Sequence, residues 1–411
     1  MNDQEWVESN RQATARVPRL DALFAACVLL GLAGLALFAR DGIRAWQAYW
    51  INFLFWMGLA QAGVVLAAVV RLSKGTWGGA MIRLSLLQVS FLPVAIVLFL
   101  GIALMSSRVL PWVANPVAGK EWWLNLPSFL LRDGIALAAL CAISVAFAYW
   151  SMRPDAGKLV EAGSSSSLAW LARGWRGAAV EKERSERKLS WLSPLLVIAY
   201  GAAYTLVGFD MIMSLDPSWY STLFGAYYFI TTGYLGIAWL AIIAALLRRV
   251  MRMETEFTVD RFHDLGKLVF AFGLLSAYFF WSQWIVLWYG NLPDEIRFVL
   301  RRTQHQPWLT LIWVVIFGGF VVPWTILLSS KIKRIPVALA TLALMIVVCG
   351  FCERVLMIVP SLHSPDSGYR FVFGVPEILI TLGFAGLYGL SLLWSLRRMP
   401  LVPERVVPER G

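Results

Sequence analysis

Long apolar stretches separated by short polar segments dominate this chain. A helix needs about 20 mostly apolar residues to cross a membrane, and strands would leave unpaired backbone amides in lipid. Ten stretches meet this length, so the pattern predicts ten transmembrane helices. They lie at residues 20–39, 47–70, 80–105, 127–150, 193–213, 221–247, 264–289, 308–330, 336–359 and 373–396.

Composition supports the same fold class. Hydrophobic residues make up 59% of the 411 residues, charged residues make up 15%, and the mean hydropathy is +0.66. A soluble domain carries about 25% charged residues, so this chain cannot cover a globular surface with polar groups. The 21 tryptophans suit a protein with many membrane–water interfaces. We therefore expect an all-α polytopic membrane protein.

Lysine and arginine are distributed unevenly between alternate connecting segments. With a cytoplasmic N-terminus, 24 of the 36 cations lie in cytoplasmic segments, 8 in outer loops and four inside the predicted spans. Cytoplasmic loops of membrane proteins carry this excess, which also accounts for the net charge of +11 without nucleic acid. We therefore predict a cytoplasmic N-terminus at 1–19, followed by four transmembrane helices within 20–150. A cytoplasmic loop at 151–192 separates them from six further helices within 193–396, and a cytoplasmic tail follows at 397–411.

The fifth and ninth predicted spans end in similar motifs. One reads Gly-Phe-Asp from Gly208 to Asp210 and the other Gly-Phe-Cys-Glu from Gly350 to Glu353, and each is followed by Pro-Ser. An offset of four helices preserves direction, so the repeat predicts two four-helix bundles, helices 2–5 and 6–9, flanked by helices 1 and 10. Asp210 and Glu353 would then be equivalent and line one outward-facing polar cavity. Chance similarity between apolar helices is the alternative.

Several charged residues lie inside the predicted spans, near the outer surface. A charge in the membrane costs roughly 2.5–3.5 kcal/mol on insertion scales, so such residues are the first candidates for function. Carboxylates beside arginines have tunable proton affinity, which a proton pathway needs. The candidates are Arg132, Asp133, Asp210, Glu353, Arg354 and Glu377. Interhelical salt bridges that hold the bundles together are the structural alternative.

Further proton-pathway candidates lie at the inner end and along the spans. His263, Asp264 and Lys267 lie at the inner mouth of the seventh span, where a histidine could collect protons. Polar residues that could relay protons between the two ends are Gln61, Tyr204, Tyr278 and Gln283. The alternative for the inner-end set is that these side chains reach from the membrane interface toward water. The alternative for the relay set is that its members are ordinary packing residues.

Several chemistries have no supporting motif. The sequence has no C-x-x-C-H motif, no mid-membrane histidine pair and no P-loop, so we expect no bound haem and no ATP-driven transport. The Cys349 to Cys352 pair lies inside an apolar helix, which favours structural thiols over a metal site. We therefore predict that this chain itself binds no metal and no resident cofactor.

An outer loop at 288–295 combines charges with aromatic residues. Its exposed polar groups suggest contact with a periplasmic partner or a cap over a lipid-soluble substrate. The docking candidates are Tyr289, Asn291, Asp294 and Glu295. A polar outer loop without a partner is the alternative.

Three stretches carry a resemblance to a known family. They are residues 52–61, residues 210–225, and the H-D-L-G-K motif at 263–267 leading to W-Y-G-N-L-P-D-E at 288–295. Together they resemble the NrfD/PsrC-like membrane subunits of alternative complex III, a quinol:electron acceptor oxidoreductase of the respiratory chain. The resemblance covers nearly the whole chain, and the outer loop is most similar to the second such subunit.

This resemblance implies a ten-helix fold with two bundles, in the inner membrane of a bacterial cell. It implies electron transport from a quinol to cytochrome c or a terminal oxidase, by a complex of several subunits. The implied partners are a sister NrfD/PsrC-like subunit, a periplasmic iron–sulfur subunit and c-type haem subunits, which would hold the haem and the iron–sulfur clusters.

The outer rim of this chain has no histidine within a helix to accept a quinol proton. We therefore expect a proton pathway or structural support from this chain, with quinone contact in addition, and no catalysis by the chain alone. The alternatives are a secondary transporter of a small solute and a purely structural membrane anchor.

Overall fold

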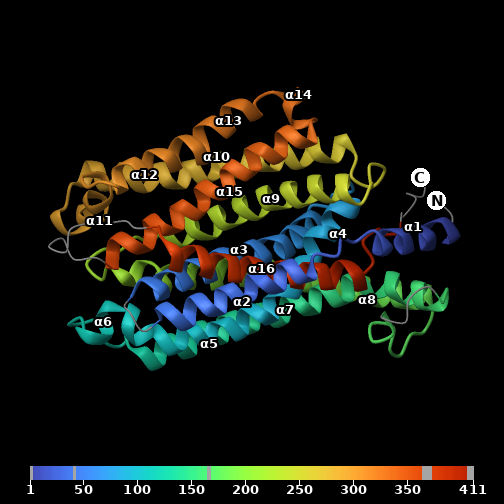
Figure 1. The fold of residues 1–411 in the computed structure, drawn as a ribbon, viewed down its shortest axis with the longest axis horizontal. Helices are drawn as coiled ribbons and strands as arrows, with labels where there is room; N and C mark the ends of the chain where they lie inside the picture. The colour runs from blue at the N-terminus through green and yellow to red at the C-terminus, as the bar shows by residue number, and fades with distance from the viewer. Residues whose placement is uncertain (1–2, 40–42, 164–167, 363–372, 405–411) are drawn as a thin grey trace.

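The computed structural model describes residues 3–39, 43–163, 168–362 and 373–404, and all regular structure within these ranges is helical. Ten helical segments of the described chain are long and apolar enough to cross a membrane, as predicted. Five of them belong to the first half of the chain (Figure 1): α2 (Asp21–Phe38), α3 (Arg44–Leu72), α4 to α5 (Gly79–Val109), α7 (Leu126–Glu161) and α8 with its last turn η3 (Ala178–Leu215).

The other five follow in the second half: α9 (Phe224–Val250), α10 (Val259–Gly290), α12 to α13 (Trp308–Leu327), α15 with its last turn η5 (Pro336–Leu362) and α16 (Val375–Arg398). Shorter helices lie outside these spans: α1 (Asp3–Ala15), α6 (Pro111–Ala114), α11 (Pro293–Thr303) and α14 (Ser330–Lys333). The chain is thus an all-α, multi-pass membrane protein.

The spans form the two predicted four-helix bundles. The first contains α3, α4 to α5, α7 and α8, and the second contains α9, α10, α12 to α13 and α15. Helix α9 packs against both α3 and α8 and so joins the bundles, and α3 is almost completely buried. The flanking helices α2 and α16 pack on each other where Gly31 and Gly383 bring their backbones together. Small residues allow such close approach between membrane helices.

Four of the described spans contain a segment that departs from regular α-helix. Helix α4 continues into α5 through a 3-10 turn, η1 (Gln88–Phe91), just before Pro93. The segment between α12 and α13 is a π-helix, η4 (Val315–Val321). The fifth and ninth spans both end in 3-10 turns, η3 (Met213–Leu215) and η5 (Val359–Leu362), as expected for related motifs. Such irregular segments often lie at functional sites.

The described residues of segment 151–192, which was predicted to be a cytoplasmic loop, are mostly helical. Helix α7 extends to Glu161 and α8 begins at Ala178, so both helices continue beyond their apolar windows. Hydropathy detects only the apolar part of a helix, whereas the polar ends are held by packing. Here Arg153 donates to Glu181 at 2.6 Å and to the carbonyl oxygen of Leu171 at 2.8 Å, and the Arg153 and Glu181 side chains are buried.

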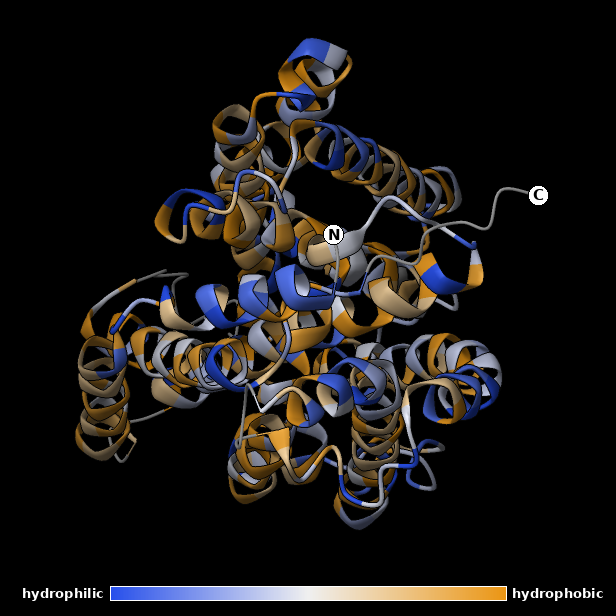
Figure 2. Ribbon diagram, turned by 90° about the vertical axis from the view of Figure 1, so that its right-hand side faces the viewer, coloured by the Kyte–Doolittle hydropathy of each residue, from blue (hydrophilic) through white to orange (hydrophobic). Residues whose placement is uncertain are grey.

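The first and last described segments of the chain lie side by side at one end of the molecule. Trp6 Nε1 donates to the carbonyl oxygen of Val402 at 2.9 Å. The Asn10 side chain donates to the same oxygen and accepts from the Val402 amide, both at 3.0 Å. Figure 2 views this end, where hydrophilic residues gather beside both termini. We call it the inner end and the opposite one the outer end.

Candidate functional site

Asp210 anchors a buried charged group at the outer end of the first bundle. It lies in the last turn of α8 and is 1% exposed. Its carboxylate accepts from Arg132 Nε at 2.6 Å and from Trp123 Nε1 at 2.8 Å. The Arg132 guanidinium also stacks over the Trp123 ring, 3.9 Å from its centroid. The indole thus covers a buried ion pair between α7 and α8.

Asp133 lies beside this pair without a hydrogen-bond donor. Asp133 is 0% exposed, and neither of its carboxylate oxygens accepts a hydrogen bond from any described residue. The carboxyl group faces that of Asp210. A buried polar group without a partner is costly, and two neighbouring carboxylates repel each other. One proton shared between Asp133 and Asp210 would supply the missing hydrogen bond and remove the repulsion.

Glu353 and Arg354 form a second group, on α15 in the second bundle. The Glu353 carboxylate accepts a hydrogen bond from the Tyr227 hydroxyl and lies 3.5 Å from Arg354. Arg354 is 1% exposed and donates to Thr231 Oγ1 at 3.3 Å and Thr232 Oγ1 at 3.1 Å. This group therefore ties α15 to α9.

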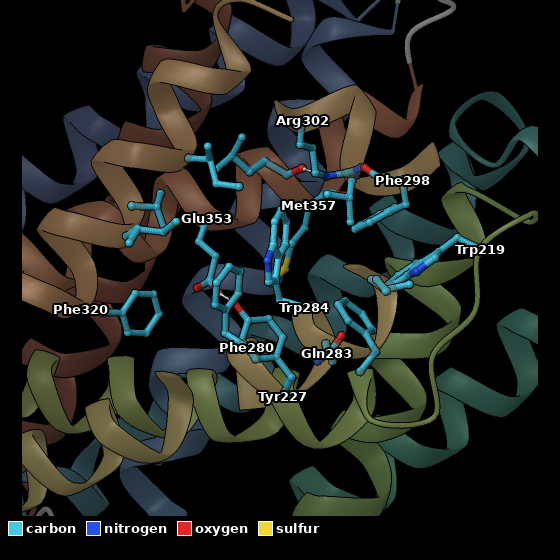
Figure 3. Close-up of a pocket in the computed structure, with 17 residues that line it drawn as sticks. Trp219, Tyr227, Phe280, Gln283, Trp284, Phe298, Arg302, Phe320, Glu353 and Met357 are labelled. Atoms are coloured by element: carbon cyan, nitrogen blue, oxygen red, sulfur yellow. Dashed lines mark hydrogen bonds between the residues drawn. The ribbon is translucent and has the colours of Figure 1, made fainter. Parts of the chain in front are cut away.

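Glu353 also borders a cavity of about 120 Å³ near the outer end of the second bundle (Figure 3). The walls are mainly aromatic and aliphatic side chains from α9, α10, α11 and α15 and from the π-helix η4. Its polar lining groups are Tyr227, Gln283, Arg302 and Glu353. Arg302 is bound at the end of α15, since it donates to the carbonyl oxygens of Leu356 at 2.7 Å and Met357 at 3.0 Å.

A second outer cavity, of about 260 Å³, lies over the first group and is lined by Lys120, Trp122, Trp123 and Tyr220, among others. Trp219 borders both cavities, and its ring stacks on Phe298 with 3.8 Å between centroids. Asp210 lines neither of these two cavities, because Trp123 covers it.

The expectation that Asp210 and Glu353 share one outward-facing polar cavity is therefore wrong. Trp123 covers Asp210 in the first bundle, whereas Glu353 borders the cavity of the second bundle. Each acid also has a cation from its own bundle as its partner.

Glu377 forms a third group, on the rim. It accepts from Arg44 through both carboxylate oxygens at 3.0 Å and from the backbone amide of Gly374 at 2.9 Å. These bonds cap the first turn of α16 and tie it to α3. The six charged residues predicted to form one cluster thus form three groups on different helices.

At the inner end, the structure brings together the three predicted residues of α10. Lys267 Nζ lies 2.8 Å from Asp264, and His263 Nδ1 lies 3.9 Å from the same carboxylate. A nearby ion pair that the sequence did not reveal joins Arg83 of α4 to Asp155 of α7, with both side chains 9% exposed.

The predicted relay residues divide between the interior and the surface. Gln61 donates to Ser144 Oγ at 2.9 Å, and Tyr204 donates to the carbonyl oxygen of Met57 at 3.3 Å, both inside the first bundle. Gln283 borders the cavity at Glu353. Tyr278 is 63% exposed on α10 and points away from the interior.

A hydrogen-bond chain near the middle of the fold joins residues that the sequence did not connect. Trp239 Nε1 donates to the Tyr388 hydroxyl at 2.7 Å, which donates to Gln88 Oε1 at 2.6 Å. It connects α9 and α16 with the 3-10 turn η1. Residues on three separate helices form it, so no motif or spacing could have revealed it.

The docking candidates lie between α10 and α11. Tyr289 is 88% exposed, and Asn291 is an exposed left-handed residue (φ 44°) that ends α10. The side chains of Asp294 and Glu295 lie outside the described part of the structure. The described cysteines Cys27, Cys141, Cys349 and Cys352 are free thiols.

Comparison of the chain with protein-family models finds no match, and comparison with curated proteins finds none either.

Proposed function

We propose that this chain is a membrane subunit of a quinol-oxidising respiratory complex of the alternative complex III type, and that it handles protons at its outer end. The sequence motifs described above support the family, with the second NrfD/PsrC-like subunit, ActF, as the most similar member. The proposal places the chain in a bacterial inner membrane with both termini in the cytoplasm. Haem and iron–sulfur clusters then belong to its partner subunits.

The observation that carries the proton role is the buried Asp133 carboxyl beside the Arg132–Asp210 pair. A structural salt bridge needs one acid for one cation, and Arg132 is already paired with Asp210. The additional acid has no donor, so it is a group whose proton can be lost and regained without breaking the ion pair. Its place near the outer end leaves a short path to the surface.

The cavity at Glu353 supports a second role, contact with a quinone head group. Aromatic walls bind a flat ring, and a carboxylate with a tyrosine hydroxyl beside it can accept a quinol proton. This carboxylate and hydroxyl could accept the quinol proton in place of a histidine, which the sequence does not place within a helix of the outer rim. Here the acceptor is the carboxylate of Glu353, with Tyr227 as its hydrogen-bond donor.

The test is proton release by the purified complex in liposomes, driven by quinol and an electron acceptor and followed with a pH-sensitive dye. Asp133→Asn should assemble normally but release fewer protons for each electron transferred. The matched control is Asp260→Asn, which removes an exposed carboxylate paired with Arg334. Normal proton release by Asp133→Asn would refute the proton role.

Purification tests the respiratory assignment separately. Stoichiometric recovery of haem and iron–sulfur subunits with this chain supports it. Recovery of the chain alone, stabilised by a small solute, would instead support the transporter alternative.

A further inference from the structure

A third cavity, of about 200 Å³, lies at the inner end, between the N-terminal helix α1, the end of α7 and the end of α16. Its polar lining includes Asn10, Arg11, Thr14, Arg397 and Arg398. The cavity is held open by fixed elements, because Trp6 and Asn10 bind the backbone of Val402 and so anchor α1 to the chain after α16.

Positive charge at this cavity exceeds the acidic groups that could balance it. Arg397 is paired with Asp21 and donates to the carbonyl oxygen of Pro18 at 2.9 Å. Arg11 and Arg398 have no acidic partner among the described residues, and Arg398 contacts the Trp394 ring, 5.1 Å from its centroid. Two arginines that line the cavity therefore have no neutralising carboxylate among the described residues, which favours an anion with several oxygen acceptors.

The cavity lies beside the inner ends of two membrane spans. The Asp21–Arg397 pair joins the first residue of α2 to the last turn of α16, the ends of two membrane spans. Beside it, Leu20 is 38% exposed and Leu23 on α2 is 57% exposed. Trp394 on α16 is 42% exposed and suits a membrane interface. An anion here would have apolar surface directly next to it on the membrane side.

We infer that this cavity binds the phosphate of an anionic membrane phospholipid, with its acyl chains along α2 and α16. Basic pockets between membrane helices at the cytoplasmic surface are suited to such head groups. Arg11 and Arg398 would bind the phosphate oxygens, and Asn10 and Thr14 would line the site. This inference does not depend on the respiratory role.

The test uses the purified full-length chain in phosphatidylcholine nanodiscs, titrated with phosphatidylglycerol, and lipid binding is read by native mass spectrometry. Arg11→Gln and Arg398→Gln should each weaken phosphatidylglycerol binding about fivefold, from roughly one interaction of a basic residue with an anionic lipid. The matched control is Arg249→Gln, which removes an exposed arginine of the inner end that does not line the cavity.

Wild-type binding by both cavity variants, or an equal loss in Arg249→Gln, would overturn the inference in favour of nonspecific attraction. Inorganic phosphate distinguishes the source of the anion. If millimolar phosphate displaces phosphatidylglycerol, the site recognises free phosphate and the lipid assignment is wrong. If phosphate has no effect while the two variants lose binding, the lipid assignment is supported.

Discussion

Asp133 and Asp210 are adjacent acids with opposite expected responses to neutralisation. Asp210 accepts two hydrogen bonds, from Arg132 at 2.6 Å and from Trp123 at 2.8 Å, whereas Asp133 accepts none from the described residues. Asp210→Asn therefore leaves the Arg132 charge without its partner in a region shielded from water. Removing one member of a buried ion pair typically costs about 3–5 kcal/mol.

Asp133→Asn should change the free energy of unfolding by less than about 1 kcal/mol, because Arg132 and Trp123 donate to Asp210 and not to Asp133, and the new amide can donate to Asp210 in place of the shared proton. Both substitutions replace a carboxyl group with an amide of nearly the same shape at neighbouring positions. Their difference therefore measures the Arg132 pairing and not a general effect of altering this region.

The assay is reversible unfolding of the full-length chain in mixed micelles of increasing SDS content, followed by tryptophan fluorescence. Asp260→Asn serves as the surface control, since its carboxylate is 77% exposed and exposed pairs contribute about 0–1 kcal/mol. If Asp210→Asn is as stable as the wild type, or if Asp133→Asn unfolds as readily as Asp210→Asn, the assigned roles are wrong.

Three further outcomes are expected. Arg153→Met should lower the free energy of unfolding by about 3 kcal/mol, because buried Glu181 loses its hydrogen-bonded partner and keeps only Arg184, at 3.6 Å. The α7–α8 connection should also become open to limited proteolysis, and unchanged proteolysis would contradict this. Ile316→Trp should fill the cavity at Glu353 and abolish quenching of tryptophan fluorescence by a quinone analogue, whereas Val337→Trp on the exposed face of α15 should not. A periplasm-only reporter should be inactive when fused to the C-terminus and active when inserted at Gly119, and the reverse pattern would invert the topology.

The ten spans and the two bundles could be predicted because they depend on local properties of the sequence. The apolar length of a segment decides whether it crosses the membrane, whatever its neighbours are. The distribution of lysine and arginine similarly predicts an orientation from the connecting segments alone. Even the shared ends of α8 and α15 follow from motifs that can be read directly along the chain.

The partners of the buried charges could not be predicted in the same way. The sequence predicts that six charged residues lie at one depth. Their partners depend on which way each helix faces: Asp210 pairs with Arg132, Glu353 with Tyr227 and Glu377 with Arg44. Depth is set by position along one helix, whereas pairing depends on the directions that two helices face. Only the packed structure specifies that relation, and so only it separates Asp133 from the other acids.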